Sequence, residues 1–308
     1  MHYSDEVSLD MFKNIPEVLS RNSGVYGDKE ALSVVNGISY SYRELNTLSR
    51  HIAAMLYALG VEPDDRVSIY SENNPHWVAA YFGILTTGAI TVPILPDFRG
   101  KELATILEHS EAKVVFISGK LLANLNGILP PNVSHIIQIE DLTLHAIEDG
   151  SRDLPGNANK ELRKITIQKD QITEHSSFYK AGYADLASII YTSGTTGRSK
   201  GVMLSHENLL FDAIQSKTMH RVIPGDVFLS VLPLAHTYEC TIGMLVPLLN
   251  GASVHYVDRP PTASYLGPVL KKYRPTTMLT VPLICLLYTS PSPRDSYADR
   301  VCRLLLEN

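Results

Sequence analysis

Residues 191–202 read YTSGTTGRSKGV, and they concentrate small residues, hydroxyls and one lysine directly after an apolar, strand-like run. Three glycines permit close approach of the backbone and positive φ angles. Such a loop can direct several backbone N–H groups at one anion, and hydroxyls and a mobile positive charge add to that field. The glycines are Gly194, Gly197 and Gly201, the hydroxyl residues are Thr192, Ser193, Thr195 and Thr196, and the cation is Lys200. The segment therefore predicts a cradle for a polyphosphate.

The pattern differs from the phosphate loop of kinases and GTPases, in which the lysine follows a glycine directly. Here two residues separate Gly197 from Lys200, and a glycine follows the lysine. The alternative interpretation is an ordinary glycine- and threonine-rich turn between two strands. The density of glycines, hydroxyls and a lysine within ten residues favours the phosphate cradle.

A family resemblance extends beyond this loop. Residues 191–209, YTSGTTGRSKGVMLSHENL, resemble the signature of the adenylate-forming superfamily, which includes acyl-CoA synthetases, luciferases and peptide-synthetase adenylation domains. Residues 40–46 (YSYRELN), 60–67 (GVEPDDRV) and 79–94 (AAYFGILTTGAITVPI) resemble the early part of that fold. Residues 230–239, SVLPLAHTYE, resemble the next motif in its long-chain fatty acid synthetase form. The resemblance covers nearly everything from Ile15 to Ile284.

The resemblance implies a reaction in two steps. A fatty carboxylate attacks the α-phosphate of Mg²⁺-bound ATP to give acyl-AMP and pyrophosphate, and the thiol of coenzyme A then displaces AMP. Because both starting partners are anionic, oriented N–H dipoles, Mg²⁺ and a lysine must offset their repulsion. By resemblance, the backbone and hydroxyls from Thr192 to Gly197 hold the β- and γ-phosphates together with Lys200. Thr192 is the candidate contact to Mg²⁺.

His236 lies in the LPLAH segment and is the second candidate catalytic residue beside Lys200. By resemblance it lies near the reacting carboxylate, where it would bind that carboxylate or gate an acyl channel. The alternative is a structural histidine after a buried strand. Tyr238 and Glu239 are weaker candidates and favour a structural role. The apolar stretch from Thr241 to Leu249 fits either an acyl tunnel or, more readily, plain core.

The elements that must position these residues follow from local patterns. Asn36-Gly37 between two short apolar runs predicts a hairpin, and Ser41 with Glu44 predicts a capping box that opens a helix. Strand-like runs at 66–70, 90–94, 113–117 and 187–191 alternate with helical ones, and residues 134–139 add a further strand. This alternation predicts an α/β fold with a mostly parallel sheet, as in the layered N-terminal domain of the adenylate-forming fold.

The domain organisation that we expect is one partial N-terminal AMP-binding domain over residues 1–284. It contains a polar connector at about 141–185, loosely structured with one short hairpin near Ile165. Residues 285–308 resemble a translated sequencing adapter, so we expect a non-native tail there. The family's later glutamate motif, ribose-binding aspartate, hinge and small C-terminal domain do not occur, which predicts an inactive fragment.

The composition limits the classes of ligand and partner that the chain is expected to bind. A net charge of −5 without a basic run argues against nucleic-acid binding. Three widely spaced cysteines, and histidines without ligand spacing, predict neither a disulfide framework nor a transition-metal site. We expect a cytoplasmic protein without a signal peptide, and the family makes peripheral membrane contact and a homodimer plausible.

Three functions remain open at this stage. The first is a long-chain fatty acid–CoA ligase, and the second is an acyl carrier protein ligase or another carboxylate-adenylating enzyme. The third belongs to a different class and is a non-catalytic nucleotide-binding module. The sequence does not distinguish coenzyme A from acyl carrier protein as acceptor, and it leaves the acyl chain length and the oligomeric state open.

Overall fold

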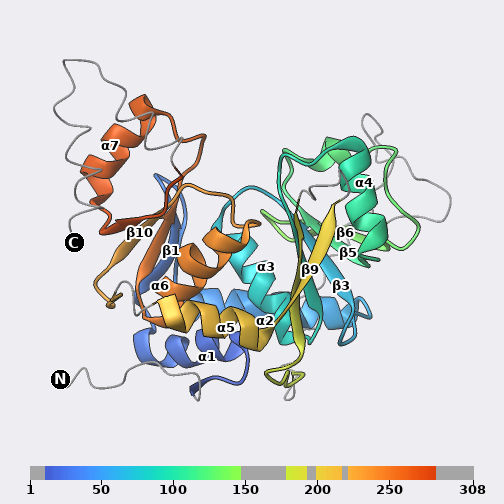
Figure 1. The fold of residues 1–308 in the computed structure, drawn as a ribbon, viewed down its shortest axis with the longest axis horizontal. Helices are drawn as coiled ribbons and strands as arrows, with labels where there is room; N and C mark the ends of the chain where they lie inside the picture. The colour runs from blue at the N-terminus through green and yellow to red at the C-terminus, as the bar shows by residue number, and fades with distance from the viewer. Residues whose placement is uncertain (1–10, 147–177, 193–198, 217–220, 282–308) are drawn as a thin grey trace.

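The computed structural model describes residues 11–146, 178–192, 199–216 and 221–281. Within these ranges the chain forms two β-sheets with helices between them and on their outer faces (Figure 1). The smaller sheet has the order β12 (Thr277–Met278), β10 (Val227–Ser230), β11 (Ser253–Tyr256), β1 (Glu30–Val34), β2 (Ser39–Ser41). All its strand pairs are parallel except the β1–β2 hairpin.

The larger sheet carries the segment with the candidate phosphate loop. Its order is β7 (Thr143–Ala146), β6 (His135–Gln138), β5 (Val114–Ile117), β3 (Arg66–Tyr70), β4 (Ile90–Ile94), β8 (Leu186–Thr192), β9 (Lys200–Ser205). The inner pairs are parallel, and the pairs at the two edges, β6–β7 and β8–β9, are antiparallel. The predicted α/β fold with mostly parallel strands is therefore present.

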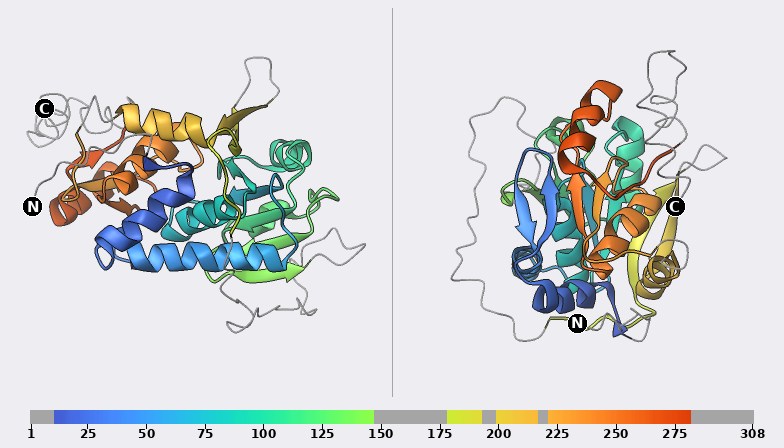
Figure 2. Two further views of the ribbon diagram at one scale, coloured as in Figure 1. Left: turned by 90° about the horizontal axis from the view of Figure 1, so that it is seen from below. Right: turned by 90° about the vertical axis from the view of Figure 1, so that its left-hand side faces the viewer.

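The helices form three layers. The helices α1 (Ile15–Tyr26), α2 (Tyr42–Ala58), α3 (Pro75–Thr86), α5 (His206–Gln215), the π-helix η5 (Glu239–Leu245) and α6 (Val246–Leu249) contribute to the main core. α4 (Gly100–His109) and the short 3₁₀ helix η2 (Leu122–Leu125) cover the other face of the larger sheet. α7 (Ala263–Tyr273) covers the outer face of the smaller one. Figure 2 shows α1 and α2 lying side by side.

Local sequence signals explain how several elements begin. The Ser41 side chain accepts a hydrogen bond from the backbone N–H of Glu44, and the Glu44 carboxylate accepts one from the N–H of Ser41, which completes the predicted capping box. Asn36 takes a positive φ of 58° in the β1–β2 turn, as the hairpin signal requires. Asn74 caps α3 through the N–H of Trp77, and Pro75 follows at the first helical position.

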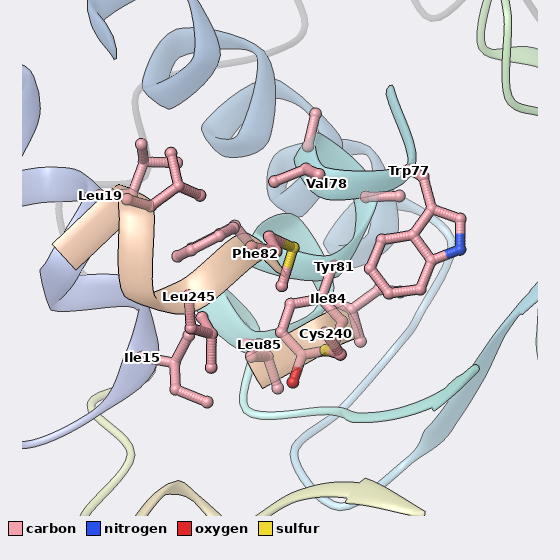
Figure 3. Packing of buried hydrophobic residues seen from close by; sticks show 14 of the residues in the cluster. Ile15, Leu19, Trp77, Val78, Tyr81, Phe82, Ile84, Leu85, Cys240 and Leu245 are labelled. Carbon is pink, nitrogen blue, oxygen red and sulfur yellow. The ribbon is translucent and has the colours of Figure 1, made fainter. Parts of the chain in front are cut away.

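The centre of the core is α3, whose side chains are buried on every side between the two sheets. Figure 3 shows Trp77, Tyr81 and Phe82 of α3 packed near Ile15 and Leu19 of α1 and near Cys240 and Leu245 of η5. The rings of Trp77 and Tyr81 are stacked with their centroids 5.4 Å apart. This apolar centre links residues that lie far apart in the sequence, and it holds both sheets at fixed positions.

Gly83 permits the close contact of α3 with α2. A Cβ atom at this position would lie 2.7 Å from Ile52 Cγ2 and 2.8 Å from the backbone oxygen of Ser49. We expect Gly83→Ala to lower the unfolding free energy by about 1–3 kcal/mol because the helices must separate. Urea unfolding measures this change. Gly24→Ala in α1 is the matched control, since a Cβ there meets nothing within 4 Å, and it should be neutral or stabilising by up to about 1 kcal/mol. Equal effects of the two variants would contradict the prediction.

The predicted parallel sheet is joined by a second sheet, because β1 pairs with β11, more than two hundred residues later. One expectation needs correction. Residues 143–146 of the predicted loose connector form β7, because Ile137 and Leu144 pair across an antiparallel ladder with buried side chains. The hairpin expected near Ile165 and the tail at 285–308 lie outside the described residues. None of the helices in the described ranges combines the length and apolarity needed to cross a bilayer.

Candidate active site

The β8–β9 hairpin carries the two ends of the candidate phosphate loop. Thr192, the last residue of β8, pairs directly with Lys200, the first residue of β9, and both side chains are exposed. The remaining predicted loop residues lie outside the described part of the chain; they are Ser193, Gly194, Thr195, Thr196 and Gly197. The antiparallel register thus places a hydroxyl and a cation together at the two sides of the loop.

Packing on both faces fixes this hairpin. On one face the Thr91 hydroxyl on β4 donates to the Ala187 carbonyl, 2.9 Å away, and the Ser188 hydroxyl lies 3.0 Å from it. On the other, the Tyr191 hydroxyl shares a hydrogen bond of 2.7 Å with Nδ1 of His109 in α4. Gly201 allows a close approach, since a Cβ there would lie 2.9 Å from Ile189 Cγ2. The hairpin is therefore held on both faces by hydrogen bonds and close packing.

The electrostatics at the loop favour an anion. Lys200 has no ion-pair partner among the described residues, so its charge is available to an anion at the start of β9. Within the same ranges no three His, Cys, Asp or Glu side chains are grouped so that they could hold a metal ion. A cation such as Mg²⁺ would need oxygen ligands from a bound phosphate, with the Thr192 hydroxyl as the protein's contribution. The residues present fit a phosphate-bearing ligand that brings its own metal.

His236 lies in the turn between β10 and η5, and its side chain is exposed. Its backbone N–H donates to the Pro233 carbonyl at 2.9 Å, and its Nδ1 accepts from the Tyr238 N–H at 3.3 Å. Figure 1 shows this orange segment extending from β10 toward the larger sheet. The imidazole faces solvent on a turn that crosses between the sheets, where it can meet a ligand, and its Nδ1 also holds the turn through the Tyr238 N–H.

Asn73 joins the two sheets at this turn, and sequence reasoning missed it. It follows β3 of the larger sheet, and its Nδ2 donates to the Leu232 carbonyl at 2.5 Å and to the Ser230 hydroxyl at 3.1 Å. Its Oδ1 accepts from the Leu234 N–H at 2.7 Å. One side chain therefore holds both ends of the segment that leads to His236. An asparagine three residues after a buried strand was the only sequence signal for it.

Glu239 was a weak candidate from the sequence, and its burial in the structure makes its carboxyl group unusual. It is 1% exposed, and burial raises the pKa of its carboxyl to about 8, although a hydrogen bond with Ser230 partly opposes this. Its Oε2 atom has no hydrogen-bond partner. The neighbouring stretch from Thr241 to Leu249 is almost entirely buried core, as the simpler of the two sequence interpretations predicts.

An open cavity of about 570 Å³ lies elsewhere, beside α7 and the β1–β2 turn, where Asn36, Arg259, Tyr265 and Lys272 contribute to its lining. None of its lining residues belongs to the β8–β9 hairpin or to the His236 turn. The predicted site residues are therefore distributed over two places, the hairpin of the larger sheet and the turn after β10. Asn73 connects the second place to the larger sheet.

Comparison with known proteins gives consistent matches over most of the chain. The family model described as "AMP-binding enzyme" matches residues 19–303. This stretch includes most of the tail at 285–308 that resembles a sequencing adapter. Crotonobetaine/carnitine–CoA ligase of Escherichia coli (strain SE11) is 31% identical over 282 residues, which are 88% of this chain and 52% of that protein. The Salmonella paratyphi B enzyme of the same name is 27% identical over 292 residues, covering 92% and 54%. The chain thus spans about half the length of the curated relatives it matches.

Solved structures show the same fold. The inhibitor-bound N-terminal domain of FACL13 from Mycobacterium tuberculosis has a TM-score of 0.76 and 22% identity, with 94% of this chain and 67% of that chain covered. The anthranilate CoA ligase AuaEII in complex with anthranoyl-AMP has a TM-score of 0.73 and 22% identity, covering 92% and 51%. At these identities the likeness shows the fold alone. It confirms the layered N-terminal α/β domain predicted from the sequence.

Proposed function

This chain belongs to the family of AMP-binding enzymes, and from that membership we propose that it is part of an enzyme that activates a carboxylate with ATP and transfers the acyl group to coenzyme A. The observation that carries the proposal is the pairing of Thr192 with Lys200 across the β8–β9 hairpin, with both side chains exposed and the lysine without an ion-pair partner in the described residues. A phosphate chain bound between them would neutralise that charge.

Each residue then has a role. Lys200 and the backbone and hydroxyls from Thr192 to Gly197 hold the β- and γ-phosphates, and Thr192 contacts Mg²⁺. A bound Mg²⁺ would supply charge neutralisation at the phosphates. His236, exposed on its turn, hydrogen-bonds the attacking carboxylate or gates its entry. The carboxylate oxygen attacks the α-phosphorus, pyrophosphate leaves, and the thiol of coenzyme A later displaces AMP.

The proposal also names the carboxylate substrate. The LPLAHTYE form of residues 232–239 supports a long-chain fatty acid. The relatives at 31% identity are crotonobetaine/carnitine–CoA ligases, which supports a shorter carboxylate with a cationic group as the second candidate. Coenzyme A is preferred to acyl carrier protein as acceptor because those relatives are named as CoA ligases. A cytoplasmic location, contact with a membrane surface and a homodimer stay predictions.

The test uses the full-length protein read from the source locus. Carboxylate-dependent exchange of pyrophosphate into ATP should occur with palmitate and be weak with crotonobetaine and carnitine. The reverse order would replace the fatty acid with the second candidate. Exchange with none of a broad set of carboxylates, together with retained ATP binding, would favour a non-catalytic nucleotide-binding module.

Lys200→Ala should slow adenylation by about a hundredfold, because one preorganised charge at the phosphates is lost. Single-turnover formation of acyl-AMP measures this effect separately from thioester formation. Lys101→Ala, which removes another exposed lysine on α4, is the matched control and should leave the rate unchanged. An unchanged rate in Lys200→Ala would remove this lysine from the mechanism.

A further inference from the structure

Parallel pairing places the end of β3 and the end of β8 at the same edge of the larger sheet. β3 pairs in parallel with β4, and β4 in turn pairs in parallel with β8. The end of β3 at Tyr70 thus lies two strand spacings, about 10 Å, from the strand that carries Thr192. Ligands of α/β proteins bind outside the carboxyl ends of such strands. Asn73, three residues after β3, therefore belongs to the same edge as the candidate phosphate loop.

The loop that carries Asn73 is fixed at both of its ends. The next residue, Asn74, caps α3 by accepting the Trp77 N–H at 2.9 Å, and its Nδ2 donates to the Glu72 carbonyl at 2.9 Å. Trp77 is fully buried at the centre of the core. Because β3 lies inside the sheet and α3 inside the core, the backbone at Asn73 has little freedom to move. Its side chain is therefore a fixed point that can hold another segment.

The carboxamide of Asn73 matches the segment after β10 group by group. Its NH₂ group faces two acceptors, the Leu232 carbonyl and the Ser230 hydroxyl, and its oxygen faces the Leu234 N–H. An amide supplies both donors and the acceptor at once. A carboxylate of the same shape would keep the acceptor, lose both donors and place a negative charge against the Leu232 carbonyl. The geometry thus selects an amide at this position.

The segment that Asn73 holds leads within two residues of Leu234 to His236. The His236 N–H donates to the Pro233 carbonyl at 2.9 Å, and the imidazole Nδ1 accepts from the Tyr238 N–H at 3.3 Å. A neutral imidazole whose Nδ1 accepts a hydrogen bond carries its proton on Nε2. The exposed side chain therefore presents an N–H donor, and the position of the turn decides where this donor lies.

We propose that Asn73 is a positioning residue, which holds the turn from Val231 to His236 at the carboxyl edge of the larger sheet so that His236 and Lys200 serve one ligand. This inference rests on the proposed function, in which His236 meets the carboxylate and Lys200 the phosphates of ATP. Without the carboxamide, the turn keeps its internal hydrogen bond between His236 and Pro233 but loses this tie to the larger sheet. The imidazole then samples positions away from the ligand.

The first measurement needs neither ATP nor a carboxylate. Diethyl pyrocarbonate reacts with the lone pair of a neutral imidazole, which in His236 is engaged by the Tyr238 N–H. Asn73→Asp removes two donated hydrogen bonds, so the turn opens more often and the lone pair is freed. Mass spectrometry gives the modification rate at each histidine. At about pH 8, where imidazoles are neutral, we expect the His236 rate to rise about three- to tenfold, the factor of about one net hydrogen bond.

A neighbouring asparagine provides the matched control. Asn74→Asp adds the same charge one residue away and keeps an acceptor for the cap of α3, so it should leave the His236 rate unchanged. His135, on β6 of the larger sheet, is the internal reference in every sample. Trp77 is the single tryptophan of the chain, and its emission checks that each variant is folded. A rise at His236 no larger in Asn73→Asp than in Asn74→Asp would overturn the proposal.

Hydrogen exchange in the wild-type chain decides the same question if Asn73→Asp fails to fold. The Leu234 N–H donates to Asn73 Oδ1 at 2.7 Å. It should therefore exchange at least about tenfold more slowly than the same amide in an unstructured peptide of this sequence. Exchange as fast as in the peptide would mean that the carboxamide does not hold the turn, and the proposal would fail.

In the full-length enzyme, a double-mutant cycle separates positioning from a general loss of stability. Single-turnover formation of acyl-AMP is measured for Asn73→Asp, for His236→Asn and for both together. Because Asn73 acts through the imidazole, Asn73→Asp should slow the step about tenfold in wild type and less than about twofold in the His236→Asn background. Equal factors in the two backgrounds would overturn the positioning role. If His236→Asn alone leaves the rate unchanged, the role of His236 in the proposed function fails, whereas the reactivity measurement still decides whether Asn73 holds the turn.

Discussion

Glutamine at position 239 is expected to stabilise the chain relative to wild type by an amount that grows with pH. Burial raises the pKa of Glu239 from an ordinary 4.5 to about 8. At 1.36 kcal/mol per pH unit, this gap corresponds to about 5 kcal/mol. The difference in unfolding free energy between Glu239→Gln and wild type should therefore increase by about that amount from about pH 4 to about pH 9.

The sign follows from which state binds the proton. Between pH 4.5 and about 8 the folded chain keeps Glu239 protonated, whereas the unfolded chain has released that proton. Stability falls with rising pH wherever the folded state binds more protons. The contribution of Glu239 is therefore fully present below pH 4.5 and is lost as the pH rises through about 8. Glutamine is neutral at every pH and has no such slope.

Urea unfolding followed by Trp77 emission at several pH values measures this difference. Glutamine adds an N–H group that needs a partner, so the absolute stability of the variant is offset by about 1–3 kcal/mol. This offset is the same at every pH. The prediction therefore concerns only how the difference in unfolding free energy between variant and wild type changes with pH. Glu207→Gln on α5, where the carboxyl is exposed, is the matched control. A slope difference no larger than that of this control would show that Glu239 is ionised and solvated in the folded chain.

Short-range patterns in the sequence predicted the elements well because their causes are local. Ser41 and Glu44 lie three residues apart and satisfy each other's backbone donors, so their capping box forms wherever the rest of the chain lies. The same holds for the hairpin turn at Asn36. The alternation of strands and helices likewise indicated parallel pairing without any knowledge of tertiary contacts.

Long-range pairing decided what the sequence left open. Nothing near Leu32 indicates that it will lie opposite Val254, and this contact divides the strands into two sheets. Asn73 looks like an ordinary polar residue after a strand, and only the fold brings it to Leu232 and Leu234. The sequence predicted candidate site residues where several polar side chains and glycines lie close together in the chain, as around Thr192 and Lys200. It was missed where partners come from separate elements.

The importance of Glu239 could have been noticed from its neighbours. Glu239 is followed by a largely apolar stretch, with Gly243 four residues on and Pro247 after that, which indicates a buried helix. Acidic side chains are almost never fully buried unless they are paired. The exposed His236 and the buried Glu239 thus occupy the opposite positions to those that a structural histidine and a solvated turn glutamate would take.

His206→Asn should make the chain more resistant to acid. His206 is 1% exposed at the start of α5, and its Nδ1 accepts a hydrogen bond from the Ile15 N–H at 3.2 Å. Burial lowers its pKa from 6.5 to about 4, with the nearby Asp185 opposing this only in part. The gap corresponds to about 3 kcal/mol, which wild type should lose as the pH falls from about 6.5 to about 4.

The sign is opposite to that of Glu239. Between about pH 4 and 6.5 the unfolded chain binds the proton of His206 and the folded chain does not, so stability rises with pH there. Asparagine retains an acceptor oxygen for the Ile15 N–H and remains neutral. Between pH 4.5 and 6.5 both side chains are neutral in the folded wild-type chain. In this range the His206 contribution to the unfolding free energy rises with pH, and the Glu239 contribution falls. Wild-type stability alone would therefore hide both effects.

The single and double variants separate these two contributions. With Glu239→Gln as background, adding His206→Asn should reduce the rise in unfolding free energy between about pH 4 and about pH 6.5 by about 3 kcal/mol. Other histidines whose pKa burial lowers, such as His76 and His255, keep the rest of that rise. His236→Asn, at an exposed imidazole, is the matched control and should leave the rise unchanged. A rise of the same size with and without His206→Asn would contradict the prediction, because the His206 imidazole would then have to be charged within the fold, with the Ile15 N–H left without its acceptor.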